Sequence, residues 1–156
     1  MKKSIVIRPL PFIFNLVLAL GGGALIGLIS RPTPAYDALT KPPLSPPPFL
    51  FGIVWSILYI LMAVSITLVV SKSNNTETAS KLYYAQLLVN FIWPILFFNL
   101  GLLTFSFIWI LLLIALVVAM IVSFWRISPL AAVLQIPYLI WLLFAAYLNL
   151  GFAILN

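Results

Sequence analysis

The sequence predicts an all-α integral membrane protein, built as a bundle of five transmembrane helices. Of its 156 residues, 65% are apolar and only 6% are charged, whereas about a quarter of the residues in soluble domains are charged. Five runs reach the length of about 20 apolar residues that a spanning helix needs. The runs are continuous rather than alternating, which favours helices over the strands of a β-barrel. Because they nearly fill the chain, we expect a single transmembrane domain over residues 1–156.

Each expected helix coincides with one apolar run. The helices are expected at residues 10–29, 49–71, 82–100, 103–125 and 130–152. The first run follows a basic N-terminus, as in a signal peptide, but it continues to Ile29 and is long enough to span, so we expect a retained helix. The tight connections at 99–104 and 126–129 predict that the last three helices are adjacent and antiparallel. The polar stretch 71–80 is expected to be a solvated turn.

The basic residues predict how the bundle is oriented. Six of them fall on the side of the N-terminus, namely Lys2, Lys3, Arg8, Lys72, Lys81 and Arg126. The other side carries only Arg31 and Lys41. Since basic residues concentrate in cytoplasmic segments, we expect a cytoplasmic N-terminus. The net charge of +6 then reflects topology and contact with anionic lipid headgroups, and nucleic-acid binding is not indicated.

The connection between the first two helices, residues 30–48, is long and dense in proline. It holds seven of the 12 prolines of the chain. Proline fixes φ and restricts the residue before it, so this connection is expected to be semi-rigid. A long connection in a compact protein is typically either disordered or a functional lid. The proline content favours a lid over a binding site.

Three rows of side chains at helical spacing predict where that site lies. The rows are Phe51, Trp55, Tyr59 and Met62; Gln86, Asn90, Trp93 and Phe97; and Tyr138, Trp141, Ala145 and Asn149. Amides within a membrane segment face a partner or a cavity, so the rows are expected to point inward. Together they suit an apolar pocket with a few polar groups beneath the lid. Rows of this kind also serve purely as packing, and the residues alone leave both interpretations open.

The residue types exclude several kinds of chemistry. The sequence has no cysteine and no histidine, which removes disulfides, thiol catalysis, histidine proton relays and the usual zinc or haem ligands; no metal site is expected. The only acidic residues, Asp37 and Glu77, lie in expected connections, whereas coupled carriers use ionisable groups inside the membrane. Proton-coupled transport and conventional catalysis are therefore disfavoured.

Three motifs resemble the translocator protein family, also called tryptophan-rich sensory proteins or peripheral-type benzodiazepine receptors. The first is Tyr36-x-x-Leu39-x-Lys41-Pro42-x-x-x-Pro46-Pro47, followed by Phe51-x-x-x-Trp55-x-x-x-Tyr59. The second is Gln86-Leu87-x-x-Asn90-Phe91-x-Trp93-Pro94, and the third is Pro137-Tyr138-x-x-Trp141-x-x-Phe144-Ala145. The resemblance covers the second to the fifth helix with matching spacing.

The resemblance implies a membrane receptor or sensor that binds tetrapyrroles, such as protoporphyrin IX and haem, as well as benzodiazepine-type ligands. No cofactor is required, and porphyrin or haem enters as ligand. The implied ligand-binding residues are Tyr36, Pro46, Phe51, Trp55, Tyr59, Asn90, Phe97, Trp141 and Ala145. The implied partners are tetrapyrrole molecules, the lipid bilayer and a second copy of the chain in a homodimer. The implied location is a bacterial cell membrane, as a multi-pass protein.

Two other functions stay open at this point. Trp55 and Trp141 match the tryptophans implicated in light-dependent porphyrin breakdown by bacterial members, which would make the protein an enzyme without a conventional catalytic site. Passive porphyrin transport is the other alternative. At Ala35 and Leu44 the family often has tryptophan, and the helix-5 cholesterol motif of animal members is absent at Leu150 and Ile154.

A pair of glycines, Gly23-x-x-x-Gly27, marks a face of the first helix that can approach another helix closely. The neighbour is either a helix of the same chain or a second protomer. The sequence does not decide between the two.

Overall fold

The computed structural model describes residues 7–156, and within this range the secondary structure is entirely helical, with five helices long and apolar enough to cross a membrane. These five spans are Pro9–Ile29, Pro48–Lys72, Glu77–Asn99, Leu103–Trp125 and Pro129–Leu155. The predicted fold class is therefore confirmed. Lys2 and Lys3, which contributed to the predicted orientation, lie outside the described residues.

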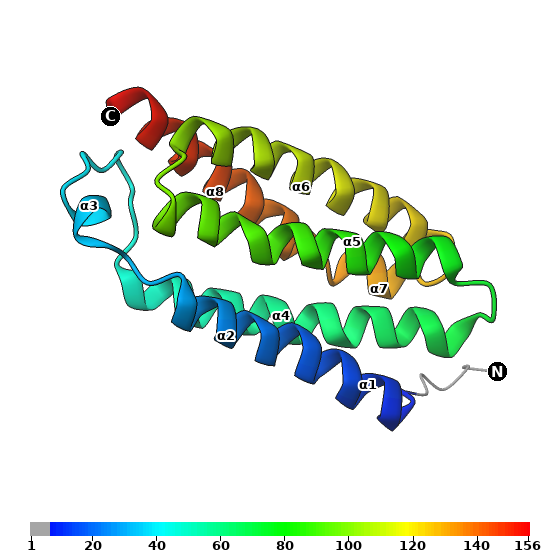
Figure 1. Cartoon of the computed structure of the whole chain (residues 1–156). Coiled ribbons are helices and arrows are strands. Elements are labelled where there is room, and N and C mark those ends of the chain that lie inside the picture. Colours follow the sequence, from blue (N-terminus) through cyan, green and yellow to red (C-terminus); the bar gives the residue numbers. More distant parts are fainter. Residues whose placement is uncertain (1–6) are drawn as a thin grey trace.

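The spans run antiparallel in sequence order, and Figure 1 shows the first span lying along the second. The first span consists of α1 (Pro9–Leu16), a π-helical turn (Val17–Gly21) and α2 (Gly22–Ile29), and the second is α4 (Pro48–Lys72). The remaining spans contain α5 (Glu77–Pro94) with a π-helical turn (Ile95–Asn99), α6 (Leu103–Trp125), and α7 (Pro129–Val133) with α8 (Ile136–Leu155). Helix α6 packs extensively against both α5 and α8.

The connection between the first two spans lies across one end of the bundle, beside the end of α8 (Figure 1). We call residues 30–48 the lid, and the end of the bundle that they cover the lid end. The lid contains one short helix, α3 (Pro34–Asp37), whose first residue is a proline with a suitable φ for this position. Thr33 caps α3 by accepting a hydrogen bond from the backbone N–H of Tyr36 at 3.3 Å. The prolines thus shape an ordered lid.

Two helix boundaries differ from the sequence-based expectation. The third span begins at Glu77 rather than at 82, so the expected turn over 71–80 is mostly helical. An acidic residue in the first turn favours the helix dipole, and the Lys81 ammonium bonds the Glu77 carboxylate at 2.6 Å, four residues away. The polar residues from Glu77 onward therefore extend the third span toward its N-terminus, instead of forming a turn before it.

The fifth span was expected as one continuous helix over 130–152, but it is interrupted. Two turn residues, Leu134 and Gln135, separate α7 from α8. Pro137 accounts for the break, because it has no N–H to donate to the carbonyl of Val133 and its ring crowds that carbonyl. Helix α8 then continues beyond 152, to Leu155.

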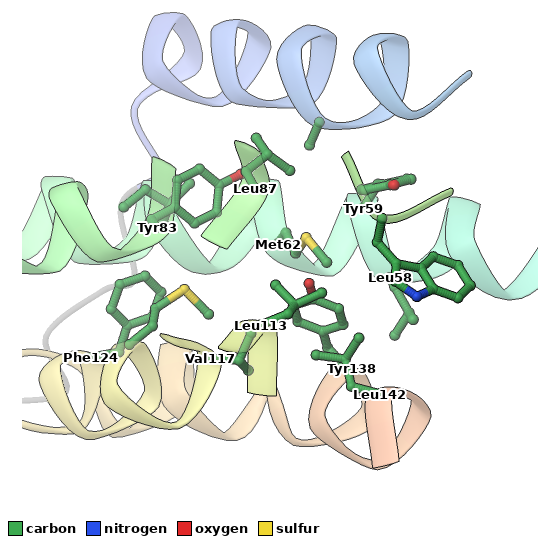
Figure 2. Close-up of a cluster of buried hydrophobic side chains, with 14 of the residues drawn as sticks. Leu58, Tyr59, Met62, Tyr83, Leu87, Leu113, Val117, Phe124, Tyr138 and Leu142 are labelled. Carbon is green, nitrogen blue, oxygen red and sulfur yellow. The ribbon is translucent and has the colours of Figure 1, made fainter. Parts of the chain in front are cut away.

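The tightly packed core lies between α4, α5, α6 and α8, toward the end of the bundle opposite the lid. Figure 2 shows this cluster, in which side chains from all four helices interdigitate. Its fully buried members include Met62, Tyr83, Val117, Phe124 and Tyr138. The bundle is therefore closed at this end, and its open space lies elsewhere.

Candidate functional site

A cavity of about 380 Å³ lies beneath the lid, between the first span, α4 and the third span. This volume falls within the range of about 300–1,000 Å³ that is usual for small-molecule sites. The residues that line it come from five parts of the chain: the first span from Leu20 to Gly27, the lid, the first half of α4, the third span around Pro94, and the end of α8. Helix α6 contributes none of them.

One wall of the cavity is aromatic. Phe51, Trp55 and Tyr59 follow one another on a single face of α4 and all line the cavity. The rings of Trp55 and Tyr59 lie 5.5 Å apart between centroids, with their planes tilted by 30°. A row of aromatic rings presents an apolar surface, against which the ring of an aromatic ligand can pack.

The deep end of the cavity carries a chain of hydrogen bonds between side chains. The Tyr59 hydroxyl donates to Asn90 Oδ1 at 2.9 Å, and Asn90 Nδ2 donates to the Tyr138 hydroxyl at 2.9 Å. The Tyr138 hydroxyl in turn donates to Gln86 Oε1 at 2.9 Å. All four residues are buried. The amides predicted to face inward therefore link α4, α5 and α8, and they fix Tyr59 and Asn90 at the cavity.

Pro94 shapes the cavity from the third span. A proline cannot donate to the carbonyl four residues earlier, which here belongs to Asn90. The helix continues as a π-helical turn from Ile95 to Asn99, a form that often occurs at functional sites. Beside it, the indole N–H of Trp93 donates to Asn149 Oδ1 at 2.7 Å, which joins this part of the wall to α8.

The lid supplies the remaining wall and its charges. The Tyr36 ring lies against the rings of Phe98 and Phe152, with centroid distances of 4.9 and 5.5 Å. Lys41 Nζ lies 5.8 Å from the centre of the same Tyr36 ring, close enough for a cation–π contact. Burial raises the pKa of the Tyr36 hydroxyl, and the neighbouring Asp37 carboxylate raises it further. Tyr36 therefore stays protonated at neutral pH, and Lys41 is a cation at the mouth of the cavity.

The structure brings together most of the predicted ligand-binding residues. Six of the nine line the large cavity: Tyr36, Pro46, Phe51, Trp55, Tyr59 and Asn90. Phe97 and Ala145 instead line a neighbouring space of about 20 Å³. Trp141 lines neither space, and its ring lies behind Phe51, with a centroid distance of 5.6 Å. The two tryptophans singled out in the sequence thus differ in position: Trp55 faces the cavity and Trp141 supports the wall.

Sequence reasoning missed the contribution of the first span. Gly23, Ala24 and Gly27 line the cavity, and a Cβ atom on Gly23 would lie 2.1 Å from the Tyr59 ring. The glycine pair was the available signal: Gly23 marks a close approach to α4 of the same chain, whereas Gly27 faces open space. Other lining residues that were not predicted include Ser30, Pro32, Ser45, Gly52, Ser56 and Phe98.

The described residues offer no cluster of histidine, cysteine or acidic side chains that could hold a metal ion. What they offer is an aromatic cavity inside the membrane, with a polar floor and a basic group at its mouth. These features define a multi-pass integral membrane protein with a small-molecule cavity under an ordered lid.

Comparison with known proteins places the chain within that class. The model of the TspO/MBR family matches residues 14–155. The chain belongs to the TspO/MBR family.

Relatives come from distant organisms. The tryptophan-rich protein TspO of Chlorobaculum tepidum is 35% identical, with 100% of this chain and 99% of the relative covered. The translocator protein homolog of Schizosaccharomyces pombe is 34% identical, with 86% and 85% covered. The human translocator protein is 37% identical, with 73% and 70% covered. The resemblance inferred from the motifs is therefore confirmed.

Proposed function

We propose that this protein is a membrane receptor or sensor that binds tetrapyrroles, such as protoporphyrin IX or haem, in the cavity under the lid. Benzodiazepine-type ligands would occupy the same space. The observation that carries the proposal is the row of Phe51, Trp55 and Tyr59 along one wall of a cavity of about 380 Å³. A flat macrocycle would stack on this row.

Two charged residues of the lid line the cavity, Asp37 and Lys41, and Lys41 is the one that suits an anionic ligand. Lys41 lines the cavity at the lid, where it would form charge-assisted hydrogen bonds with the propionate groups of a porphyrin. The chain has neither histidine nor cysteine, so haem would be held through its ring and its propionates, without an imidazole or thiolate ligand to the iron. The predicted cytoplasmic N-terminus would place this mouth on the outer side of the membrane, and the predicted bacterial cell membrane and homodimer belong to the same proposal.

The test is a titration of the purified protein with protoporphyrin IX in the dark, followed by tryptophan fluorescence. We expect saturable quenching in the wild type and weaker binding in Trp55→Phe, because Trp55 lines the cavity. Trp141→Phe is the matched variant, since that ring lies behind Phe51, and we expect it to change affinity less. Absence of saturable quenching in the wild type would refute the proposal.

Light-dependent porphyrin breakdown is a second candidate, and the position of Trp55 favours it. An indole on the cavity wall would contact a bound porphyrin directly, and so could react with the photoexcited ring. Illumination of the three proteins above separates the two functions. Loss of porphyrin absorbance that needs Trp55 would support breakdown, whereas equal loss in all three proteins would contradict it.

A further inference from the structure

One side of the cavity is lined by small residues that have a large exposed fraction. Ala24 and Gly27 on α2, and Gly52 and Ser56 on α4, are all exposed, and all four line the cavity. They lie within two membrane spans. At about 1.5 Å per residue, Gly52 and Ser56 are roughly 6 and 12 Å from the start of α4. An exposed surface at this depth faces lipid.

Within residues 7–156, the two glycines on this side face open space. A Cβ atom added to Gly27 or to Gly52 would meet nothing within 4 Å. The contrast lies deeper in the bundle, where a Cβ atom on Gly22 would lie 2.7 Å from the Phe91 ring and one on Gly23 would lie 2.1 Å from Tyr59. Helix α1 also packs more extensively against α4 than α2 does. The first span thus closes on its neighbours away from the lid and leaves a gap near it.

The polar group in the gap is already satisfied. The Ser56 hydroxyl donates to the backbone carbonyl of Gly52 at 2.7 Å, one helical turn earlier. A serine bonded to its own helix presents no free donor to hydrocarbon. The gap is therefore compatible with lipid and with an apolar ligand.

The lid, by contrast, is held down. The backbone N–H of Thr40 donates to Asn156 Oδ1 at 2.8 Å, and Asn156 Nδ2 donates to the Thr40 carbonyl at 3.1 Å. The Tyr147 hydroxyl donates to the Pro43 carbonyl at 3.0 Å. A Cβ atom on Gly151 would lie 2.6 Å from Pro42, which shows how closely the lid rests on α8. Opening the lid would break all of these contacts, whereas the gap requires none to break.

We propose that the gap between α2 and α4 is a lateral portal, through which a flat amphiphile dissolved in the bilayer enters the cavity. This rests on the proposed function, and it adds the class of ligand and its route. The apolar ring passes between Gly27 and Gly52, while the anionic edge stays level with Lys41 at the lid. The portal selects thin molecules, because a ring that is one atom thick passes small residues where a bulky one does not.

The absence of native cysteine permits a reversible block of the portal. Gly52→Cys is modified with a bulky methanethiosulfonate reagent in lipid nanodiscs, and protoporphyrin IX binding is followed by stopped-flow fluorescence. We expect association and dissociation both to slow by about tenfold or more. Slower dissociation is the sign of a blocked route, because a label that only took up ligand space in the cavity would speed dissociation. Reduction of the label with dithiothreitol restores both rates. Gly21→Cys is the control, since Gly21 is exposed on the first span but does not line the cavity.

Three results would contradict the proposed portal. They are an unchanged association rate after labelling at position 52, an equal slowing of association after labelling at position 21, or a loss of affinity at position 52 that comes from faster dissociation alone. Slowing by a label at Leu44→Cys on the exposed face of the lid, without slowing at position 52, would indicate entry through the lid instead.

A ligand-free measurement separates failure of the portal from failure of the proposed function. The fluorescence of Trp55, taken as the difference between wild type and Trp55→Phe, is recorded in bilayers of phosphatidylcholine with brominated chains. With an open portal, bromine quenches Trp55, and the bulky label at position 52 relieves the quenching. Quenching that the label does not relieve would overturn the portal, whether or not porphyrin binds.

Discussion

The two halves of α4 have similar side chains and opposite surroundings. All nine buried residues of this helix lie between Leu58 and Val69, and none lies between 48 and 57. The second half is enclosed by α1, α5 and α7, whereas the first half forms the wall of the cavity and one edge of the gap between α2 and α4. One continuous helix thus serves as core at one end and as binding surface at the other.

The comparison teaches that hydrophobicity does not locate the core of a membrane protein. Lipid chains are as apolar as leucine, so helix association depends on packing and on hydrogen bonds. Ile57 and Ile66 illustrate the point: Ile57 is 53% exposed and Ile66 is 0% exposed, although they are the same residue on the same helix. The two halves should therefore respond differently to the same substitution.

The largest expected effect is the loss of stability on truncating a side chain in the closed half. Ile66→Ala should lower the free energy of unfolding by about 2–5 kcal/mol, because it leaves a cavity in a packed region. Its matched control is Ile57→Ala, which should change stability by no more than about 0.5 kcal/mol, since lipid fills the space. Unfolding in mixed micelles with increasing SDS measures both. Equal losses of stability in the two variants would show that the first half of α4 is packed too. That result would contradict the difference between the two halves.

A smaller effect is expected at the boundary between the halves, where the first span closes on α4. Gly23→Ala places a methyl group against the Tyr59 ring, which is held by its bond to Asn90. The strain should cost about 1–3 kcal/mol and weaken ligand binding by moving Tyr59. Gly27→Ala, one turn further toward the lid, meets open space and should leave the stability unchanged. Thermal denaturation and porphyrin titration of the two variants provide the measurements, and identical behaviour would contradict the assigned boundary.

The smallest expected effect concerns the hydrogen bonds that link α4 to α5 and α8 near the boundary between the halves. Tyr138→Phe removes a hydroxyl that both accepts from Asn90 and donates to Gln86, whereas Tyr59→Phe removes only one bond. Side-chain hydrogen bonds in membranes contribute about 0.6 kcal/mol on average, and up to about 1.7. Tyr138→Phe should therefore destabilise the protein by roughly twice as much as Tyr59→Phe. A larger loss for Tyr59→Phe in the same SDS assay would show that the chain of bonds is organised around Tyr59 instead.

The sequence predicted the spans and most of the cavity because both leave periodic signals. Apolar runs identified the five spans, and the spacing of Phe51, Trp55 and Tyr59 identified the wall. The break in the fifth span was missed, although Pro137 was visible, because prolines are tolerated inside membrane helices when neighbours satisfy the freed carbonyl.

Residues near the cavity were harder to separate from residues that line it. Trp141 and Ala145 share one face of α8, yet neither reaches the large cavity, because the side chain of Phe51 lies between this part of α8 and the open space. Spacing along a helix gives the direction of a side chain but not the distance to the opposite wall. The contribution of Ala24 and Gly27 was not predicted for a related reason. Small residues line a cavity because their side chains leave its space unfilled.

The contact between the lid and the end of α8 has a consequence for the order in which the protein is made. Thr40 and Asn156 exchange two hydrogen bonds across 116 positions of the chain. During synthesis, the lid emerges before the third, fourth and fifth spans exist, so these contacts are missing until α8 is in the membrane. The aromatic wall on α4 is made early and stays uncovered for most of translation. The roof of the cavity is therefore completed only with the last span, and a protein arrested before α8 would carry an unroofed site.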